Sequence, residues 1–269
     1  MAMLNLFKDG KSKVIIMSYD DGNVDGDKQL IDIFNKNGIK GTFNLCGYNY
    51  VPGGKYADRI PEIREIYSGH EIAMHAYSHA QLQLVPRAEV IYQVQRDKEV
   101  LEELAGYPVR GLAYPYGTYN EQVVELLEAL DVKYARAGAT TQKFKLPERF
   151  TVWNPTMSHA HGILEKLDEM LANKWRELMV LFIWGHSWAY LGENPKCSWE
   201  TMEAFCQKAG ENSDKIWFAT CSELYDYCTA LSRIEISANR KMFVNPSAIS
   251  VWLCVDGEPI ELKPGVTRI

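Results

Sequence analysis

Two histidines and a pair of adjacent carboxylates are the residues of this chain best suited to metal chemistry. Asp20 and Asp21 are neighbours, and His75 and His79 stand four residues apart. Successive side chains leave an extended backbone in different directions, so Asp21 can reach a metal while Asp20 reaches the water beside it. Two carboxylates this close repel each other unless a cation is near. Asp21, His75 and His79 therefore predict an open metal site, which suits zinc in hydrolysis or ferrous iron in oxygenation.

The first carboxylate cluster also matches part of a calcium-binding loop. The matching positions are Asp21, Asn23, Asp25, Gly26 and Asp32. Three features argue against calcium: Asp32 replaces the usual bidentate Glu, Lys28 replaces an apolar residue, and a β-branched run replaces the incoming helix. In either case, Asp25 or Asp27 is expected to cap the helix that follows.

His186 has a predicted role as well. It follows the apolar run Val180–Ile183 and is flanked by Trp184 and Trp188. This arrangement favours a general acid between two rings that stack on a sugar, and a partly buried structural histidine is the alternative.

The remaining histidines are expected to take no part in the chemistry. His159 and His161 lie near Trp153 and Pro155 and are predicted to be exposed loop residues, with a position lining a pocket as the alternative. His70 begins a predicted strand and is expected to be structural.

The elements that must position these side chains alternate along the sequence. Short β-branched runs predict strands at Lys13–Tyr19, Gly41–Leu45, Glu71–Met74, Val109–Ala113, Lys133–Ala135, Val180–Ile183 and Ile216–Ala219. Amphipathic stretches predict helices at Asp27–Asn37, Arg87–Ala105, Glu121–Leu130, Ile163–Asn173 and Thr201–Ala209. The alternation is typical of a parallel sheet with crossover helices, and both a closed barrel and an open sheet fit it.

Five polar clusters directly follow predicted strands. They begin at Ser18, His75, Tyr114, Arg136 and Gly185. In parallel α/β folds, the carboxyl ends of the strands form the ligand-binding face. Five such clusters on one side of a sheet therefore predict a common site.

The pattern changes after about Ala230. Strands without intervening helices are predicted at Ile234–Ser237, Lys241–Val244 and Ile249–Val255, and Asp256-Gly257 predicts a hairpin turn. We expect residues 1–230 to form the α/β domain. Residues 231–269 are too few to fold alone and should form a small antiparallel β appendage packed on it.

Composition and charge exclude several classes of protein. The 269 residues are 46% hydrophobic and 24% charged, as in an ordinary globular protein. A net charge of -6 argues against nucleic acid as a partner. The longest apolar run, Met179–Trp184, is too short to cross a membrane. Residues 1–13 lack the features of a signal peptide, so a cytoplasmic location is expected, with export as the alternative if an export signal has been removed from the sequence. Six cysteines without a C-x-x-C pair predict buried, reduced thiols.

In chain order, the polar clusters resemble the motifs of the polysaccharide deacetylase family, also called the NodB-homology domain or carbohydrate esterase family 4. The family's T-F-D-D-G motif is similar to residues 18–22 (SYDDG), and its H-[ST]-x-x-H motif to residues 75–79 (HAYSH). Its R-x-P-x-G motif resembles residues 113–117 (AYPYG), and its apolar strand ending in His resembles residues 181–186 (LFIWGH). The likeness covers about residues 13–230.

This resemblance implies a distorted (β/α)7 barrel that carries out hydrolysis with a divalent metal ion, for which zinc is the favoured choice. It makes Asp21, His75 and His79 the metal ligands, Asp20 the base, the backbone N–H of Tyr116 an oxyanion donor and His186 the acid. The predicted substrate contacts are Trp153, Trp184, Trp188 and Pro115.

Two departures from the family pattern affect these roles. Ala113 stands where the family has the arginine that braces the catalytic Asp, and Ala76 replaces the Ser or Thr after the first ligand histidine. Arg110, three residues before Ala113, should face the other way by strand alternation. Arg136 ends the next predicted strand, and we hypothesise that it takes the place of the missing arginine beside Asp20. The alternative is that Arg136 is a surface residue of an irregular loop.

The expected reaction is removal of acetyl groups from an N-acetylated sugar, oligosaccharide or glycan fragment. Hydrolysis of O-acetyl esters or small cyclic amides is one alternative, and a non-catalytic sugar-binding barrel is another. Asp20 and His186 argue against binding alone, which needs neither residue. A non-haem iron oxygenase would need a cosubstrate site, for which no residues are recognised.

Overall fold

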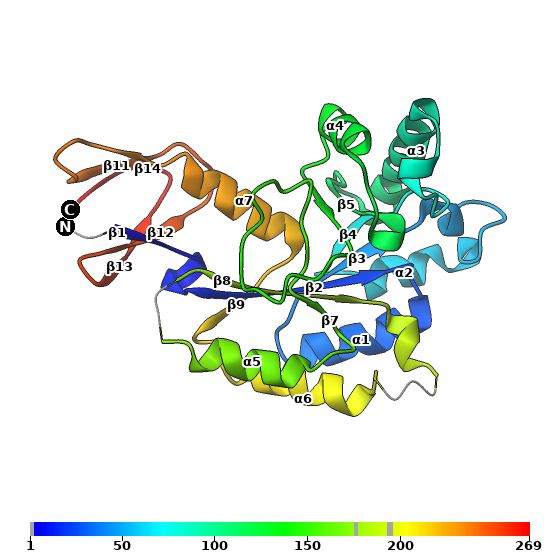
Figure 1. Cartoon of the computed structure of the whole chain (residues 1–269), viewed down its shortest axis with the longest axis horizontal. Helices are drawn as coiled ribbons and strands as arrows, with labels where there is room; N and C mark the ends of the chain where they lie inside the picture. Colours follow the sequence, from blue (N-terminus) through cyan, green and yellow to red (C-terminus); the bar gives the residue numbers. More distant parts are fainter. Residues whose placement is uncertain (1–2, 175–176, 193–195) are drawn as a thin grey trace.

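The computed structural model describes residues 3–174, 177–192 and 196–269 and contains a large parallel sheet with helices around it (Figure 1). The order of its strands is β6-β5-β4-β3-β2-β8-β7, and β9 pairs with the beginning of β2. The strands are β2 Lys13–Asp20, β3 Gly41–Leu45, β4 Glu71–Met74, β5 Gly111–Ala113, β6 Tyr134–Arg136, β7 Met157–Ser158, β8 Met179–Gly185 and β9 Ile216–Phe218. The sheet curls into a distorted (β/α)7 barrel, which confirms the predicted fold class.

The helices alternate with the strands as predicted. They are α1 Val24–Lys36, α2 Ile60–Ile66, α3 Arg87–Ala105, α4 Glu121–Ala129, α5 Ile163–Ala172, α6 Trp199–Gly210 and α7 Cys221–Ser232. The short α2 and the whole of α7 were not predicted. The start of α7 is nevertheless encoded locally, because the Thr220 side chain and Glu223 form a reciprocal capping box. α3 ends at Gly106, whose φ of 77° suits glycine.

Alternation along β2 separates the two sides of the barrel wall. Ile15, Met17 and Tyr19 face the helices and join the larger apolar core. Val14 and Ile16 face the other way, into the apolar cluster inside the barrel. Because side chains alternate along a strand, Asp20 continues this inward row at the carboxyl end of β2. The interior is thus apolar where the strand begins and polar where it ends.

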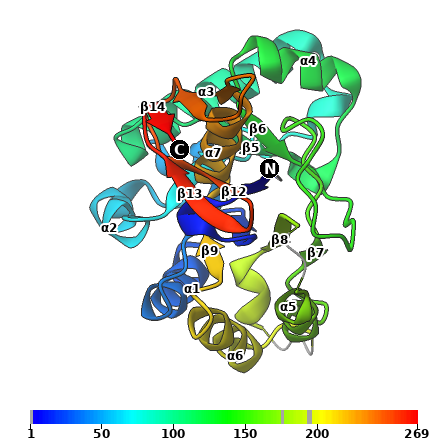
Figure 2. The ribbon, with the colours of Figure 1, turned by 90° about the vertical axis from the view of Figure 1, so that its left-hand side faces the viewer.

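The appended strands lie at the end where β2 begins (Figures 1 and 2). They form two antiparallel sheets, β1-β12-β13 and β10-β11-β14, from β1 Met3–Leu6, β10 Glu235–Ile236, β11 Met242–Asn245, β12 Val251–Val255, β13 Glu258–Leu262 and β14 Gly265–Arg268. The predicted Asp256-Gly257 hairpin turn is confirmed, with φ of 51° and 99° at the two residues. The pairing of β1 with β12 adds a segment from the start of the chain to this region. The boundary at residue 230 stays a prediction.

Two smaller expectations concern cysteines and membranes. No disulfide joins the six cysteines, which all belong to the described residues, and all but Cys228 are buried. Within residues 3–174, 177–192 and 196–269, no helix combines the length and the apolar character that a membrane crossing requires.

Candidate active site

The predicted metal ligands meet at the carboxyl edge of the parallel sheet. Asp21 follows β2, and His75 follows β4. The Nε2 atoms of His75 and His79 lie 3.5 and 3.6 Å from Asp21 Oδ1, and the candidate ligand atoms of the three residues all lie within 4.8 Å of one another. Two imidazoles and a carboxylate at this spacing can hold a divalent cation and leave coordination positions open.

The surroundings of His75 fit the role of a metal ligand. Its Nδ1 lies 2.8 Å from the carbonyl oxygen of Ala113, so the ring donates there and presents Nε2 to the cluster. Burial lowers the pKa of His75, which favours the neutral imidazole that binds metals. The backbone N–H of His75 also donates to Asp97 Oδ2 at 3.0 Å. A backbone carbonyl thus orients the ring, although Ala76 lacks the hydroxyl of the family motif.

The backbone around the cluster is held in a left-handed conformation at non-glycine residues. The φ values are 74° at Asp21, 59° at Ala76, 57° at His79 and 61° at Tyr116. Non-glycine residues rarely adopt such φ values. These backbone conformations are kept only where the surrounding structure enforces them, which is commonly the case at functional sites. The Tyr116 ring also packs edge-on against His79, with centroids 4.7 Å apart. Residue 116, the predicted oxyanion donor, therefore lies at the metal cluster.

Asp20 is buried directly behind this cluster. Arg136 contacts both of its carboxylate oxygens and is only 1% exposed, so the alternative of a surface arginine is excluded. Arg110 instead pairs with Asp226 of α7 at 2.7 Å. Burial raises the pKa of Asp20, but the charge of Arg136, together with its hydrogen bonds, outweighs that effect and lowers it. Asp20 is therefore held as a carboxylate.

Asn44, which is not among the predicted site residues, also contacts Asp20. Its Nδ2 donates to Asp20 Oδ1 at 2.9 Å and to Ser18 Oγ at 2.8 Å. The signal was present in the sequence as an amide in the otherwise mostly apolar β3. A buried amide in such a strand needs a partner, and the neighbouring β2 ends in the candidate base.

His186 lies on the other side of the two aspartates. Its Nε2 is 3.9 Å from Asp20 Oδ2 and 3.8 Å from Asp21 Oδ2. The rings of Trp188 and Trp184 lie 4.8 and 5.7 Å from the imidazole. Trp188 Nε1 donates to Asp21 Oδ2 at 2.9 Å. The structure therefore brings His186 together with the predicted base and ligands.

The segment that follows His186 is anchored on α1. Ser187 Oγ donates to Asp27 Oδ1 at 2.5 Å, and the Tyr67 hydroxyl donates to Asp27 Oδ2 at 2.5 Å. A Cβ on Gly26 would lie 2.9 Å from Ser187 Oγ, so the two segments are in close contact. Burial raises the pKa of Asp27 to about 7 against the effect of both hydroxyl donors.

The structure corrects the prediction for the start of α1. The N-cap is Asn23, whose side chain accepts the N–H of Gly26 at 3.0 Å, and neither Asp25 nor Asp27 caps the helix. Because α1 begins at Val24, most of the candidate calcium positions are helical. The loop that calcium requires is therefore not formed.

Two of the four predicted substrate contacts, Trp153 and Pro115, have buried side chains. Trp153 is 1% exposed and packs on Phe182 at 4.6 Å, so its ring cannot stack on a sugar. Pro115 is buried as well. Trp184 is half-buried, with the Arg136 guanidinium 4.8 Å from its ring, which leaves Trp188 as the exposed ring among the four predicted contacts.

His159 is also buried, contrary to the expectation of an exposed loop residue, and burial lowers its pKa to about 3. It packs edge-on against Tyr19 and Tyr190. His161 is exposed as expected. His70 is structural, since it accepts the N–H of Gly41 at 3.0 Å.

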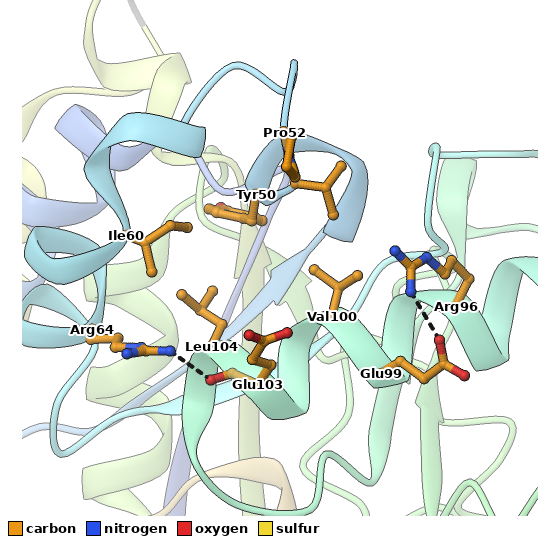
Figure 3. Close-up of a pocket in the computed structure, with 10 residues that line it drawn as sticks. Tyr50, Pro52, Ile60, Arg64, Arg96, Glu99, Val100, Glu103 and Leu104 are labelled. Carbon is orange, nitrogen blue, oxygen red and sulfur yellow. Dashed lines mark hydrogen bonds and ion pairs between the residues drawn. The ribbon is translucent and has the colours of Figure 1, made fainter.

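Of two pockets on this side of the molecule, one adjoins the candidate site and the other does not. One of about 260 Å³ adjoins the metal cluster and is lined by Asp21, Cys46, Tyr48, Asn49, Ser78 and His79. A larger one of about 450 Å³ lies between α2 and α3, beneath residues 50–52 (Figure 3). None of the predicted ligand or catalytic residues lines the larger pocket. The smaller pocket is the one continuous with the candidate chemistry.

Comparison with known proteins gives a family match in the first half of the chain. Residues 7–135 match the family model described as polysaccharide deacetylase, a range that contains the predicted metal ligands and Asp20. Over this range, which is just under half of its length, the chain is similar to the polysaccharide deacetylase family. The matched range ends before Arg136 and His186, so the family match by itself does not cover the second half of the site.

Among curated relatives, a peptidoglycan-N-acetylglucosamine deacetylase from Bacillus cereus is 32% identical over 149 residues, which are 54% of this chain and 52% of the relative. A chitin deacetylase from Arthroderma benhamiae is 29% identical over 133 residues, which are 49% of this chain and 35% of the relative. The chain thus spans about half or less of the length of these relatives. A Mycobacterium smegmatis protein assigned as a polysaccharide deacetylase shares the fold, with a TM-score of 0.62, 19% identity, and coverage of 86% of this chain and 95% of that one.

Proposed function

We propose that this protein hydrolyses N-acetyl groups of a glycan and depends on a divalent metal ion, preferably zinc. The observation that carries the proposal is the convergence of Asp21, His75 and His79 beside Asp20 and His186 at one edge of the sheet. The family relatives that act on peptidoglycan and chitin, as their names state, support an N-acetylated polysaccharide as the substrate class.

A metal held by Asp21, His75 and His79 would supply a Lewis acid that polarises the acetyl carbonyl and lowers the pKa of a bound water. Asp20, kept ionised by Arg136, accepts a proton from the attacking water. The backbone N–H of Tyr116 donates to the oxyanion that develops on the carbonyl. These residues act on the face of the acetyl group that the water attacks.

The leaving nitrogen needs a separate proton source, because an amine leaves poorly unless it is protonated. His186 is suited to this step, since its Nε2 lies within 4 Å of both aspartates and its ring is next to the exposed Trp188. Trp188 can then cover one face of the sugar while its N–H holds Asp21. An oxygenase would have no use for a base and an acid beside the same metal cluster.

The test combines metal content, measured by mass spectrometry, with acetate release from a panel of N- and O-acetylated sugars. His75→Ala should lose bound metal and acetate release together, because one of three ligands is gone. Asp20→Asn should retain the metal and lose hydrolysis by about a thousandfold or more, because an amide cannot accept the proton. Full metal occupancy in His75→Ala, or an active Asp20→Asn, would contradict the proposal.

A further inference from the structure

Both histidine ligands of the candidate metal cluster belong to one short loop, residues 75–79, which follows β4. Its backbone is strained, because Ala76 and His79 have left-handed φ values of 59° and 57°. A single hydrogen bond inside the loop, from the His79 N–H to the Ala76 carbonyl at 3.1 Å, closes its last turn. Such a conformation persists only when the surrounding structure holds it. The position of both ligands therefore depends on what contacts the backbone of this loop.

Two buried polar residues of α3 make those contacts. Gln93 and Asp97 stand four residues apart, so they lie on one face of the helix. Asp97 Oδ2 accepts the N–H of His75 at 3.0 Å. Gln93 accepts the N–H of Tyr77 at its backbone carbonyl, at 3.1 Å, and the N–H of Ser78 at Oε1, at 2.9 Å. One helix thus accepts three N–H groups of the segment that carries the ligands.

The other partners of Gln93 fix the orientation of its amide. Its Nε2 donates to Ser78 Oγ at 2.8 Å and to Glu89 Oε1 at 2.9 Å. Together with the bond that Oε1 accepts, the amide oxygen and the amide nitrogen are both used. A buried amide with all its polar atoms paired has one favoured orientation. Gln93 is therefore a rigid support for the loop.

Asp97 connects the loop to the neighbouring strand. Its Oδ1 accepts the N–H of Gly47, just beyond β3, at 2.6 Å. The His75 N–H that it accepts at Oδ2 is shared with the carbonyl of Leu45, the last residue of β3, at 2.9 Å. A single carboxyl group thus holds the ends of two adjacent strands and the first ligand histidine in one arrangement.

Packing alone gives no reason for polar residues at these two positions. The other buried residues of α3 are all apolar: Val90, Val94, Val100, Leu101 and Leu104. Gln93 and Asp97 are only 4% and 0% exposed, and burying an amide or a carboxyl group costs free energy unless hydrogen bonds replace those made with water. Most of the replacement bonds come from the ligand loop, which gives these residues a use that an apolar side chain could not supply.

We propose that Gln93 and Asp97 are positioning residues for the metal cluster. They hold the loop so that the Nε2 atoms of His75 and His79 stay within 3.5 and 3.6 Å of Asp21 Oδ1. The inference rests on the proposed function, because it assumes a divalent metal ion at this cluster. It adds that the affinity for the ion depends on a helix that contributes none of the three candidate ligands.

The experiment measures the dissociation constants of Zn²⁺ and Co²⁺ by competition with a chelator, and it records the visible absorption spectrum of the Co²⁺-loaded protein. Gln93→Met nearly conserves volume and removes the three side-chain hydrogen bonds. It should weaken binding of both ions about tenfold, as the loss of a group that orients a metal ligand commonly does. The Co²⁺ spectrum should shift as well, because it reports the arrangement of the ligands.

Asp97→Asn should have a larger effect. An asparagine can accept one of the two N–H groups but turns its NH₂ toward the other. Metal binding should weaken by up to about a hundredfold. Urea unfolding of each metal-free variant shows whether it is folded, and if Asp97→Asn does not fold, Gln93→Met alone decides the outcome.

Glu102→Met is the matched control, because Glu102 also uses a side-chain oxygen of α3 to accept a backbone N–H, that of Val109 at 3.1 Å, which lies outside the ligand loop. It should leave both dissociation constants within about twofold of the wild type and the spectrum unchanged. A folded Gln93→Met protein that binds both ions like the wild type, or an equal loss in Glu102→Met, would overturn the inference and leave the proposed function intact. A wild type that binds neither ion would overturn the proposed function and the inference with it.

Discussion

The two ends of the barrel each bury a carboxylate, and they stabilise it in different ways. At the amino end, Glu71 of β4 accepts hydrogen bonds from the Thr42 hydroxyl at 2.9 Å, the Tyr134 hydroxyl at 2.8 Å and the Ser222 N–H at 3.0 Å. The Ser222 hydroxyl is a further donor. The hydrogen bonds to both oxygens of Glu71 thus come from neutral groups of β3, β6 and α7.

The carboxyl end is built from charge and strained backbone. Asp20 is paired with the Arg136 guanidinium, and four non-glycine residues around the cluster have left-handed φ values. Within the described residues, Arg136 Nε and Nη1 and Trp184 Nε1 are buried without a hydrogen-bond partner. The amino end closes the barrel, whereas the carboxyl end keeps polar groups available for chemistry. The following predictions test this difference, in order of their expected effect on hydrolysis.

The largest effect is expected from the cation at the carboxyl end. Arg136→Ala should lower kcat/KM at neutral pH by about a hundredfold, the upper range for the loss of a residue that orients an active-site group. Arg136 is the largest influence that lowers the pKa of Asp20 against burial, so its removal should raise that pKa. Because the base acts as a carboxylate, the acidic limb of the pH–rate profile should move to higher pH.

Metal content is the control for this variant, since the ion pair of Arg136 is with Asp20, which is not one of the three candidate ligands. It should be unchanged in Arg136→Ala. Arg136→Lys keeps a charge but offers no planar fork and should recover part of the rate. An acidic limb that stays in place would show that burial and the other cations, not Arg136, set the ionisation of Asp20.

A smaller and more selective effect is expected from the segment after His186. Ser187→Ala removes the hydrogen bond to Asp27 and frees the segment that carries His186 and Trp188. Acetate release from an N-acetyl sugar should fall about tenfold, because protonation of the leaving amine depends on the position of His186. An aryl acetate, whose leaving group needs no proton, should change by less than about twofold.

Tyr67→Phe is the matched control for Ser187→Ala. It removes the other hydroxyl donor to Asp27, on the side of α2, and should lower stability without changing the ratio of amide to ester hydrolysis. If the rates of amide and ester hydrolysis fall equally in Ser187→Ala, then Ser187 stabilises the fold and does not position His186.

How far the sequence predicted this fold depends on whether an element carries its own periodic signal. The inner strands and the long helices were recognised because buried β-branched runs and amphipathic spacing are local properties. β7, with two residues, and α2, with seven, are too short for such a signal. β1 was missed for another reason: its pairing partner β12 is about 250 residues away, and pairing is a tertiary property.

The site was predictable where strand ends determine it. Asp20, Asp21, His75, Arg136 and His186 all follow or end strands of one parallel sheet, so the topology alone brings them together. Burial was not predictable in the same way. Trp153 and His159 lie in irregular segments whose exposure depends on what packs over them, and both turned out to be buried. Their residue types suggested function, but neither is available to a ligand.

A substitution at the amino end of the barrel should lower the free energy of unfolding and leave kcat nearly unchanged. Glu71→Gln replaces an acceptor with an NH₂ group that faces hydroxyl and N–H donors, which should cost about 1–3 kcal/mol of unfolding free energy. Urea unfolding measures this loss. The value of kcat for acetate release should stay within about twofold, because Glu71 is at the opposite end of the barrel from the cluster. A large loss of kcat in a folded Glu71→Gln variant would show that the two ends are coupled.

The smallest effect on hydrolysis is expected from a substitution at Asp27. This residue tests whether the ionisation of a buried carboxylate depends on the end of the barrel at which it lies or on the groups that contact it. Asp27 lies near the carboxyl end but, like Glu71, is held by neutral donors, and burial raises its pKa to about 7 where Arg136 lowers that of Asp20. Its ordinary value is 3.8, so as pH rises from about 4 to about 7 the unfolded chain releases a proton that the folded protein keeps. The contribution of Asp27 to the free energy of unfolding is therefore fully present below about pH 4. It falls between about pH 4 and about pH 7, by at most about 1.4 kcal/mol per pH unit.

The Asp27→Asn variant has no proton to lose at this position and can still accept the hydrogen bond from Ser187. Its free energy of unfolding relative to the wild type should therefore increase between about pH 4.5 and about pH 7.5. Urea unfolding of both proteins at several pH values measures the difference. A difference that does not vary with pH would mean that the two hydroxyls alone keep Asp27 ionised, and that Asp20 would not need its arginine to remain a carboxylate.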